Sequence, residues 1–379
     1  MFGKRIPLFK LFGFSVSIDI TWFILAILIT WTLAEEFFPH RFAKYGGFSK
    51  PTYWWMGIAG AFGLFASIVF HEFCHSLIAS RYGLPMKGIT LFIFGGVAEM
   101  VDEPDRPRTE FLMAVAGPIS SVLLGIGIFL VYLAVKQIGW LGPVKAVLQW
   151  LITLNFFLAG FNLLPAFPLD GGRVLRSILW AVKGNLRWAT KIASQLGSAF
   201  GLFLIIMGLW FFIGGDFVDG VWLALIGMFI RTASQMSYRQ LLVRAALSGE
   251  EIRHFMKSDP ITVAPSISVE QLVNDYFYRY HLKMFPVCDG NLLLGCVTSN
   301  QVKQVPKDQW SQQTVRQLMK PCSGENTVDP ETDAVKALSI MNRTGNSRLM
   351  VVEADKLVGI VTLKDMLKFL DLKIDLEGQ

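Results

Sequence analysis

The chain has 379 residues, of which 53% are hydrophobic and only 17% are charged. A soluble protein of this length carries about a quarter charged residues, so the composition excludes a wholly soluble protein and predicts that much of the chain faces lipid. The formal net charge of +6 fits Lys and Arg at membrane surfaces. The more polar C-terminal part has no basic cluster with interleaved aromatic residues, which argues against nucleic acid as a partner.

Six apolar segments precede residue 239, and we expect each to form a transmembrane helix in the lipid bilayer; they cover about 18–38, 53–80, 109–135, 144–165, 192–213 and 218–229. Lys and Arg, Arg173 and Arg176 among them, are more frequent beside the segment ends that would face the cytoplasm. This bias predicts a multi-pass protein of the plasma membrane with both termini in the cytoplasm. The first segment lacks a small-residue cleavage site, so we interpret it as a retained helix.

Two histidines and a glutamate interrupt the second apolar segment. In a helix, His71 and His75 lie four residues apart on one face, and Glu72 lies next to that face. Two neutral imidazoles at this spacing can bind one zinc ion, and the glutamate can take a proton from the attacking water. The alternative, structural histidines bonded to backbone carbonyls, would bury polar groups in lipid with little return. We interpret Cys74 as a small apolar filler, since a catalytic zinc ion keeps its fourth position for water.

The segment 83–100 follows this helix, and it is too short to cross the membrane as a helix. Its core is apolar and β-prone and is bracketed by glycines, Gly95 and Gly96 among them. Extended backbone at membrane depth needs shelter from protein or from a water-filled cavity. We therefore expect a re-entrant β-hairpin whose edge pairs with an extended substrate segment. An interfacial β-loop without a substrate role is the alternative.

The fourth apolar segment ends in a second polar group. Pro165 and Pro168 stop the helix, and Gly171-Gly172 are expected to open a turn, so that Asp170 lies on non-helical backbone. The cytosolic boundary follows three residues later. His75 lies about 9 Å from the cytosolic end of its own helix at 1.5 Å rise per residue. The aspartate is therefore expected near the same membrane face as the histidines, where a zinc ion would partner its carboxylate.

Together these motifs resemble the site-2 protease family of intramembrane zinc metalloproteases. The resemblance covers about residues 12–235 and is carried by His71-Glu72-Phe73-Cys74-His75, Asn162-Leu163-Leu164-Pro165 and Leu169-Asp170-Gly171, with Gly95-Gly96 and Gly117-Pro118 in support. It implies that His71, His75 and Asp170 bind one zinc ion per chain and that Glu72 is the catalytic base. It also implies that Asn162 stabilises the substrate or the developing oxyanion.

After residue 239 the composition becomes soluble, and an imperfect internal repeat of about 64 residues appears. Each copy resembles a CBS domain, and such pairs commonly bind ATP, ADP or AMP in their cleft and often form homodimers. The second copy carries Thr362 and Asp365 in the ribose-binding pattern, whereas the first has Thr298 but Gln301 in place of the aspartate. The resemblance implies one competent nucleotide site in the second copy; a purely structural CBS pair is the alternative.

The predicted fold is a polytopic α-helical membrane protein, with six transmembrane helices and a re-entrant β-loop, plus a C-terminal cytosolic α/β tandem CBS domain. The expected boundaries are 1–238 for the membrane domain, 239–250 for a linker, 251–310 and 311–372 for the CBS domains, and 373–379 for a tail. The predicted function is a zinc metalloendopeptidase that cleaves membrane-protein substrates within or near their transmembrane segments, modulated by adenine nucleotide. The alternative is a CBS-regulated transporter or channel that uses the His/Asp cluster as an ion path.

Overall fold

A computed structural model describes residues 5–11, 13–42, 47–84, 86–92, 95–100, 104–136, 142–290, 292–354 and 356–369. The predicted tail, 373–379, lies outside these ranges. The chain divides into two compact units, Met1–Leu241 and Leu242–Gln379. Each unit has its own packing and is described separately.

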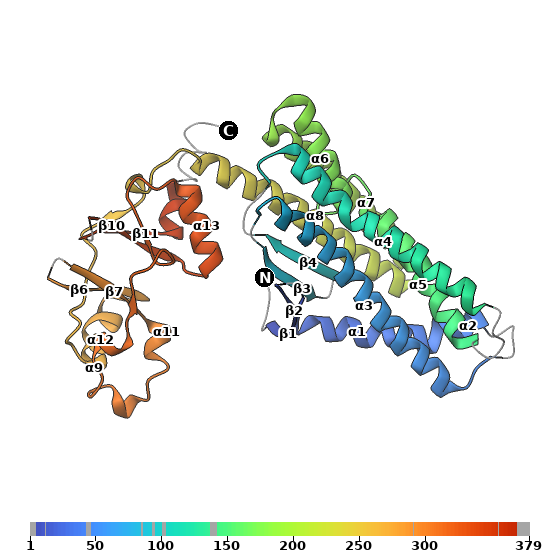
Figure 1. Ribbon diagram of the computed structural model, residues 1–379, viewed down its shortest axis with the longest axis horizontal. Helices are drawn as coiled ribbons and strands as arrows, with labels where there is room; N and C mark the ends of the chain where they lie inside the picture. Colours follow the sequence, from blue (N-terminus) through green and yellow to red (C-terminus); the bar gives the residue numbers. More distant parts are fainter. Residues whose placement is uncertain are drawn as a thin grey trace. The chain divides into compact units, whose positions relative to one another are not determined.

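The first unit is built from long helices, seen in blue to yellow in Figure 1. They are α1 (Thr21–Thr32), α2 (Phe38–Phe42), α3 (Lys50–Arg81), α4 (Pro107–Val135), α5 (Gly142–Asn162), α6 (Asp170–Lys183), α7 (Leu186–Ile213) and α8 (Phe217–Leu247). A π-helical turn, Leu33–Phe37, joins α1 to α2. Among the described residues, six helices are long and apolar enough to span a membrane, which agrees with the six predicted segments: Thr21–Arg41, α3, α4, α5, α7 and α8.

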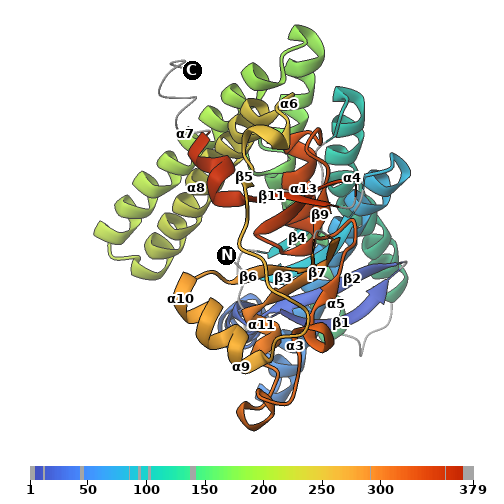
Figure 2. The same ribbon diagram turned by 90° about the vertical axis from the view of Figure 1, so that its left-hand side faces the viewer.

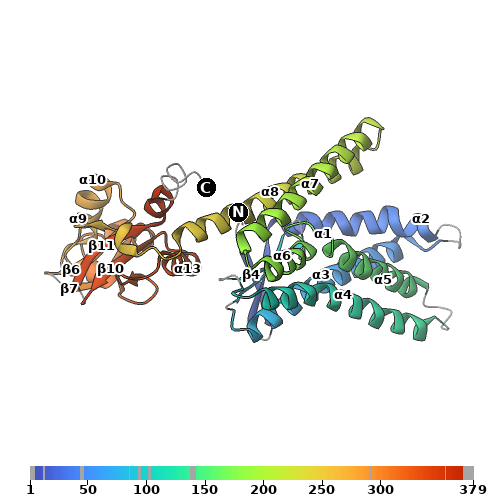
Figure 3. The ribbon, with the colours of Figure 1, turned by 90° about the horizontal axis from the view of Figure 1, so that it is seen from above.

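Helices α3, α4 and α5 pack against one another and form the frame of this unit (Figures 1 and 3). Ser49 caps the start of α3, since its hydroxyl accepts a hydrogen bond from the Thr52 N–H, and the helix ends at Arg81 as the charge pattern predicted. Asn155 of α5 is completely buried and donates to the Ser67 hydroxyl of α3 at 3.1 Å. This interhelical hydrogen bond satisfies the amide nitrogen of Asn155 within an apolar segment, whereas its buried Oδ1 has no partner among the described residues.

A four-stranded sheet lies against α3 and α1, with strand order β1-β2-β3-β4 (Figure 2). Its strands are β1 (Arg5–Leu11), β2 (Phe14–Asp19), β3 (Met86–Phe92) and β4 (Gly95–Met100). The predicted hairpin forms as antiparallel β3 and β4. A second hairpin, formed by β1 and β2, was not predicted; its strand β2 pairs with β3 in parallel orientation. The strand β4 is at the end of the sheet order, and it packs on α3.

Two sequence-based expectations about backbone were wrong. Asp170 does not lie on non-helical backbone, because α6 begins there and runs for 14 residues. The following glycines permit close packing rather than a turn: a β-carbon on Gly171 would come within 2.2 Å of the Leu163 carbonyl oxygen. The helix α8 runs to Leu247, so residues 239–247 of the predicted linker are helical.

The second unit contains one sheet of strand order β6-β7-β11-β10-β9 (Figure 2). Its strands are β5 (Lys257–Ser258), β6 (Met284–Asp289), β7 (Leu292–Thr298), β8 (Lys320–Pro321), β9 (Thr327–Val328), β10 (Arg348–Glu353) and β11 (Lys356–Thr362). Short helices accompany them: α9 (Val269–Gln271), α10 (Tyr278–Tyr280), α11 (Ser299–Val302), α12 (Val315–Leu318) and α13 (Ala334–Thr344).

The two sequence repeats occupy equivalent positions in this sheet. The strand β5, which precedes the first repeat's helices, pairs with β11 of the second repeat, and β8 pairs with β7 of the first. Lys257 thereby faces Ile360, and Lys320 faces Cys296. The repeat therefore folds as two interlocked copies, each with a hydrophobic core of its own.

Candidate metal centre

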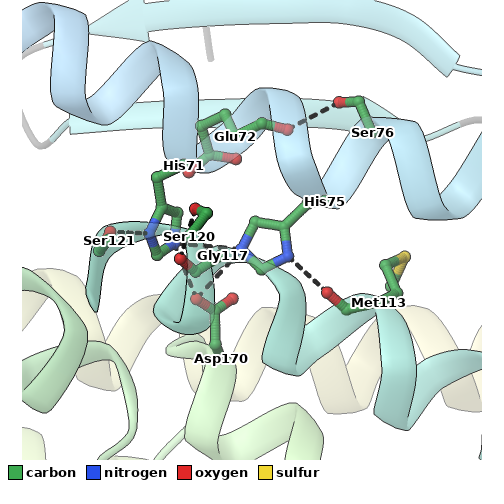
Figure 4. Close-up of polar contacts among 9 residues, drawn as sticks. All are labelled: His71, Glu72, His75, Ser76, Met113, Gly117, Ser120, Ser121 and Asp170. Carbon is green, nitrogen blue, oxygen red and sulfur yellow. Dashed lines mark hydrogen bonds and ion pairs between the residues drawn. The ribbon is translucent and has the colours of Figure 1, made fainter. Parts of the chain in front are cut away.

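The helix α3 presents two histidines to the interior of the first unit. His71 and His75 are 3% and 7% exposed, although much of α3 has an apolar outer surface. Their spacing of four residues puts both rings on the helix face that packs against α4. Asp170, in the first turn of α6, reaches the same point from the opposite side (Figure 4). Three elements that are far apart in sequence thus converge here.

The three side chains form a nearly equilateral triangle of ligand atoms. His71 Nε2 lies 3.0 Å and His75 Nε2 lies 3.1 Å from Asp170 Oδ2, and the two ring nitrogens are 3.1 Å apart. Ligand atoms around a tetrahedral zinc ion with bonds of 2.0–2.2 Å are roughly 3.3–3.5 Å apart. The spacing of the side chains is therefore close to that of three zinc ligands.

The outer ring nitrogens fix how the histidines face the centre. His75 Nδ1 lies 2.6 Å from the Met113 carbonyl oxygen, so this nitrogen carries the proton and Nε2 presents its lone pair. His71 Nδ1 is 2.9 Å from the Ser121 hydroxyl. A lone pair that faces a carboxylate at 3.1 Å is repelled unless a cation or a proton lies between them. The donor set of two imidazoles and one carboxylate suits zinc.

Helix α4 approaches the centre through a glycine. A β-carbon on Gly117 would lie 2.1 Å from His75 Nε2 and 2.5 Å from His71 Nε2. The space beside the two nitrogens is therefore kept open by the absence of a side chain at this position (Figure 4). The sequence marked Gly117 only as part of a motif, because the partner of a single glycine cannot be predicted from its neighbours.

A cavity of about 350 Å³ opens onto this centre. Besides His75 and Asp170, it is lined by Glu72, Asn162 and Gly96, so three more predicted site residues come together there. Gly95 starts β4 and faces Phe92 across the hairpin, with a positive φ of 121°. Other lining residues were not singled out as site residues by the sequence; they are Met86, Phe92, Met113, Pro168, Leu169, Arg173, Phe229 and Ala233.

The predicted nucleotide residues lie in the second unit, at the ends of equivalent strands. Thr298 lines a cavity of about 710 Å³ and caps α11, with Gln301 Oε1 accepting from its N–H and hydroxyl groups. Thr362 donates to Asp365 Oδ2 at 2.6 Å. The other oxygen of Asp365 lies 3.3 Å from Lys257 Nζ. The carboxylate predicted to bind ribose is thus already paired with a cation.

Comparison with known proteins relates the two units to two families. The model of peptidase family M50 matches residues 59–141 and 137–206, which include both histidines and Asp170. The CBS domain model matches residues 251–306 and 315–372.

Similar proteins cover nearly the whole chain. The candidate zinc metalloprotease Rip3 of Mycobacterium tuberculosis is 32% identical over 369 residues, which is 97% of this chain and 93% of that protein. The zinc metalloprotease MJ0392 of Methanocaldococcus jannaschii is 32% identical over 320 residues, covering 83% of this chain and 86% of that protein. A solved structure of the site-2 protease from the same archaeon is 29% identical, with 62% of this chain and 94% of that chain covered and a TM-score of 0.43.

Proposed function

Because the chain belongs to peptidase family M50 and carries a tandem pair of CBS domains, we propose that it is an intramembrane zinc endopeptidase. It hydrolyses peptide bonds within or near the transmembrane segments of membrane-protein substrates. The observation that carries this proposal is the triangle of His71, His75 and Asp170 beside a cavity that also contains Glu72.

The residues of the centre have two separate roles, metal binding and proton transfer. His71, His75 and Asp170 would hold one zinc ion, which would acidify water and polarise the scissile carbonyl. Glu72 lines the same cavity as His75 and is not one of the three ligands, which fits the role of the base. Glu72 takes the proton of the attacking water and returns it to the leaving nitrogen.

Two further elements of the cavity receive the substrate backbone. The strand β4 is the last strand in the sheet order, and its Gly96 packs directly on Glu72, where a β-carbon would meet the glutamate Cγ at 2.9 Å. An extended substrate that adds to β4 would pass Glu72 with those carbonyl groups free that point away from β4. A helical substrate hides these carbonyls in its own hydrogen bonds, so it must unwind before cleavage. Asn162, at the end of α5, donates to the substrate or to the developing oxyanion.

We infer that the centre lies in the membrane near the cytoplasmic surface and that β3 and β4 form a re-entrant hairpin. The helix α3 ends at Arg81, and His75 precedes that residue by about 9 Å along the axis. The distribution of Lys and Arg supports both termini in the cytoplasm of a plasma-membrane protein. Water from the cytoplasm then has a short route to the cavity.

The deciding experiment uses the purified full-length chain with a panel of single-pass membrane substrates. We expect about one zinc ion per chain, cleavage by the parent protein, and no cleavage by Glu72→Gln with its zinc content unchanged. A Glu72→Gln variant that cleaves at the parent rate would exclude Glu72 as the base. Ion flux through liposomes without any cleavage, together with absence of zinc, would favour the transporter alternative.

We also infer that the CBS pair binds an adenine nucleotide and adjusts protease activity, as a monomer or as a homodimer through these domains. The cavity that contains Thr298 carries an excess of positive charge, with four basic residues and one acidic residue: Lys283, Lys303, Lys320, Arg348 and Glu325. Phosphate groups would neutralise this excess. Added ATP, ADP or AMP should change the cleavage rate of the full-length protein, and calorimetry that detects no binding would remove this part of the proposal.

A further inference from the structure

A buried ion pair joins α4 to α6 close to the metal centre. Arg176 Nε donates to Glu110 Oε1 at 2.6 Å, and Arg176 Nη2 contacts the same oxygen. Glu110 is completely buried, and Arg176 is 4% exposed. Removing two charges from water costs several kcal/mol per ion, so such a pair is weak evidence for stability. Its best-attested use is to fix the register of the elements that carry it.

Glu110 lies on the face of α4 that contacts the histidines. Residues 110, 113, 117 and 121 are spaced by three, four and four, so they form one stripe along the helix. Met113 and Ser121 hold the outer nitrogens of the two histidines, and Gly117 leaves room beside the inner nitrogens. A contact that fixes the position of α4 along its axis at Glu110 therefore also fixes the position of α4 beside the two histidines.

Arg176 contacts the segment that carries the third ligand. It follows Asp170 by six residues on α6, and its guanidinium carbon lies 5.0 Å from the centre of the Phe167 ring. Phe167 is buried and precedes Asp170 by three residues. A cation over an aromatic ring is attracted to its face, which ties the arginine to this segment as well as to Glu110.

We infer that Glu110 and Arg176 are positioning residues: their ion pair fixes α6 against α4 so that Asp170 meets the metal together with His71 and His75. This inference rests on the proposed zinc site. A slide of α6 by one residue would move Asp170 by about 1.5 Å. That shift is about half of the 3.0 Å that separates Asp170 Oδ2 from His71 Nε2. An apolar pair of similar volume could keep the helices packed, but it would not fix this position.

The test compares zinc affinity, by competition with a chelator, and the absorption spectrum of bound Co²⁺ in the full-length protein. The double variant Glu110→Leu/Arg176→Met removes both charges of the pair, so neither ion is left buried without the other. We expect thermal unfolding of the metal-free protein to be little changed, zinc affinity to fall roughly 10- to 100-fold, and the cobalt spectrum to shift. Ser177→Ala is the matched control, because its buried hydroxyl donates to the Val174 carbonyl oxygen within α6 itself, and this change should leave zinc affinity at the parent value.

Arg176→Lys provides a second variant that keeps the charge and loses the planar guanidinium. We expect it to fold and to bind zinc about 10-fold more weakly than the parent. If either folded variant matches the parent in zinc affinity and in cobalt spectrum, the pair has only a structural role and the inference is wrong. If the parent protein itself binds neither ion, the proposed metal centre fails, and this inference fails with it.

Discussion

Gly117 lies directly against the imidazole ring of His75, since a β-carbon on Gly117 would be 2.1 Å from His75 Nε2. Carbon and nitrogen atoms cannot approach so closely, and the clash would fall on the nitrogen that faces the metal. The ring of His75 is also held close to α4, because its outer nitrogen is hydrogen-bonded to the Met113 carbonyl oxygen of that helix. The backbone of α4 therefore forms one wall of the centre.

We predict that Gly117→Ala abolishes zinc binding. The added methyl group would displace both histidine rings, and overpacking of this kind costs about 1–3 kcal/mol in stability as well. Metal analysis of the purified protein should show little zinc, against about one ion per chain for the parent. Gly127→Ala is the matched control on the same helix, because a β-carbon there meets nothing within 4 Å. Full zinc content in Gly117→Ala would contradict the geometry of the centre.

The hydroxyl of Ser121 orients His71, and we predict that Ser121→Ala weakens zinc binding. Loss of a hydrogen bond to the outer nitrogen of a ligating histidine typically costs 10- to 100-fold in metal affinity, so about 10-fold is expected here. Ser120→Ala is a close control: the Ser120 hydroxyl donates to the Gly117 carbonyl oxygen within α4. Equal zinc affinities for the two variants would show that the 2.9 Å contact of Ser121 does not orient the ring.

Local patterns in the sequence were sufficient to predict the six long apolar helices and the three side chains that converge at the candidate centre. Six long apolar runs give six candidate spans, and the spacing of His71 and His75 gives one helix face. Asp170 could be placed near them because its segment and α3 were both expected to end at the same membrane face. Each of these predictions depends on neighbouring residues or on flanking charge, and the contacts of Asp170 agree with them.

Features that depend on partners far away in the chain could not be predicted. Arg176 was counted among the flanking charges of the membrane segments, yet it is buried against Glu110, 66 residues away. The strand β2 pairs with β3, about seventy residues later in the chain. The adjacent glycines Gly171 and Gly172 are typical of a turn, but here they let α6 start against the preceding loop.

Gly96 sets the position of Glu72, and we predict that Gly96→Ala lowers the cleavage rate without loss of zinc. A β-carbon there would lie 2.9 Å from Glu72 Cγ and 2.9 Å from Ile68 Cγ2, so the glutamate side chain would have to move. Displacement of a catalytic group by about 1 Å can reduce the rate on the order of 100-fold. Zinc content measured on the same sample serves as the control. A variant that loses both zinc and activity would instead indicate general disruption of the centre.

The two CBS repeats differ in how their equivalent lysines are used. Lys257 pairs with Asp365 at 3.3 Å, whereas Lys320 lines a cavity in which the corresponding residue is the neutral Gln301. A lysine that already neutralises a carboxylate has less to gain from a phosphate than one that faces a neutral amide. The anion site is therefore expected in the first repeat, although the ribose pattern favoured the second.

We predict that Lys320→Ala weakens ATP binding to the full-length protein, while Lys257→Ala, the equivalent change in the other repeat, has a smaller effect. Loss of one charge-assisted hydrogen bond costs about 1.5–3 kcal/mol, which corresponds to a Kd roughly 10- to 100-fold higher for Lys320→Ala. Isothermal titration calorimetry at constant salt measures both variants, and the difference should shrink as ionic strength rises. If Asp365→Asn or Lys257→Ala abolishes binding and Lys320→Ala does not, the nucleotide occupies the second repeat, where Thr362 and Asp365 would hold its ribose.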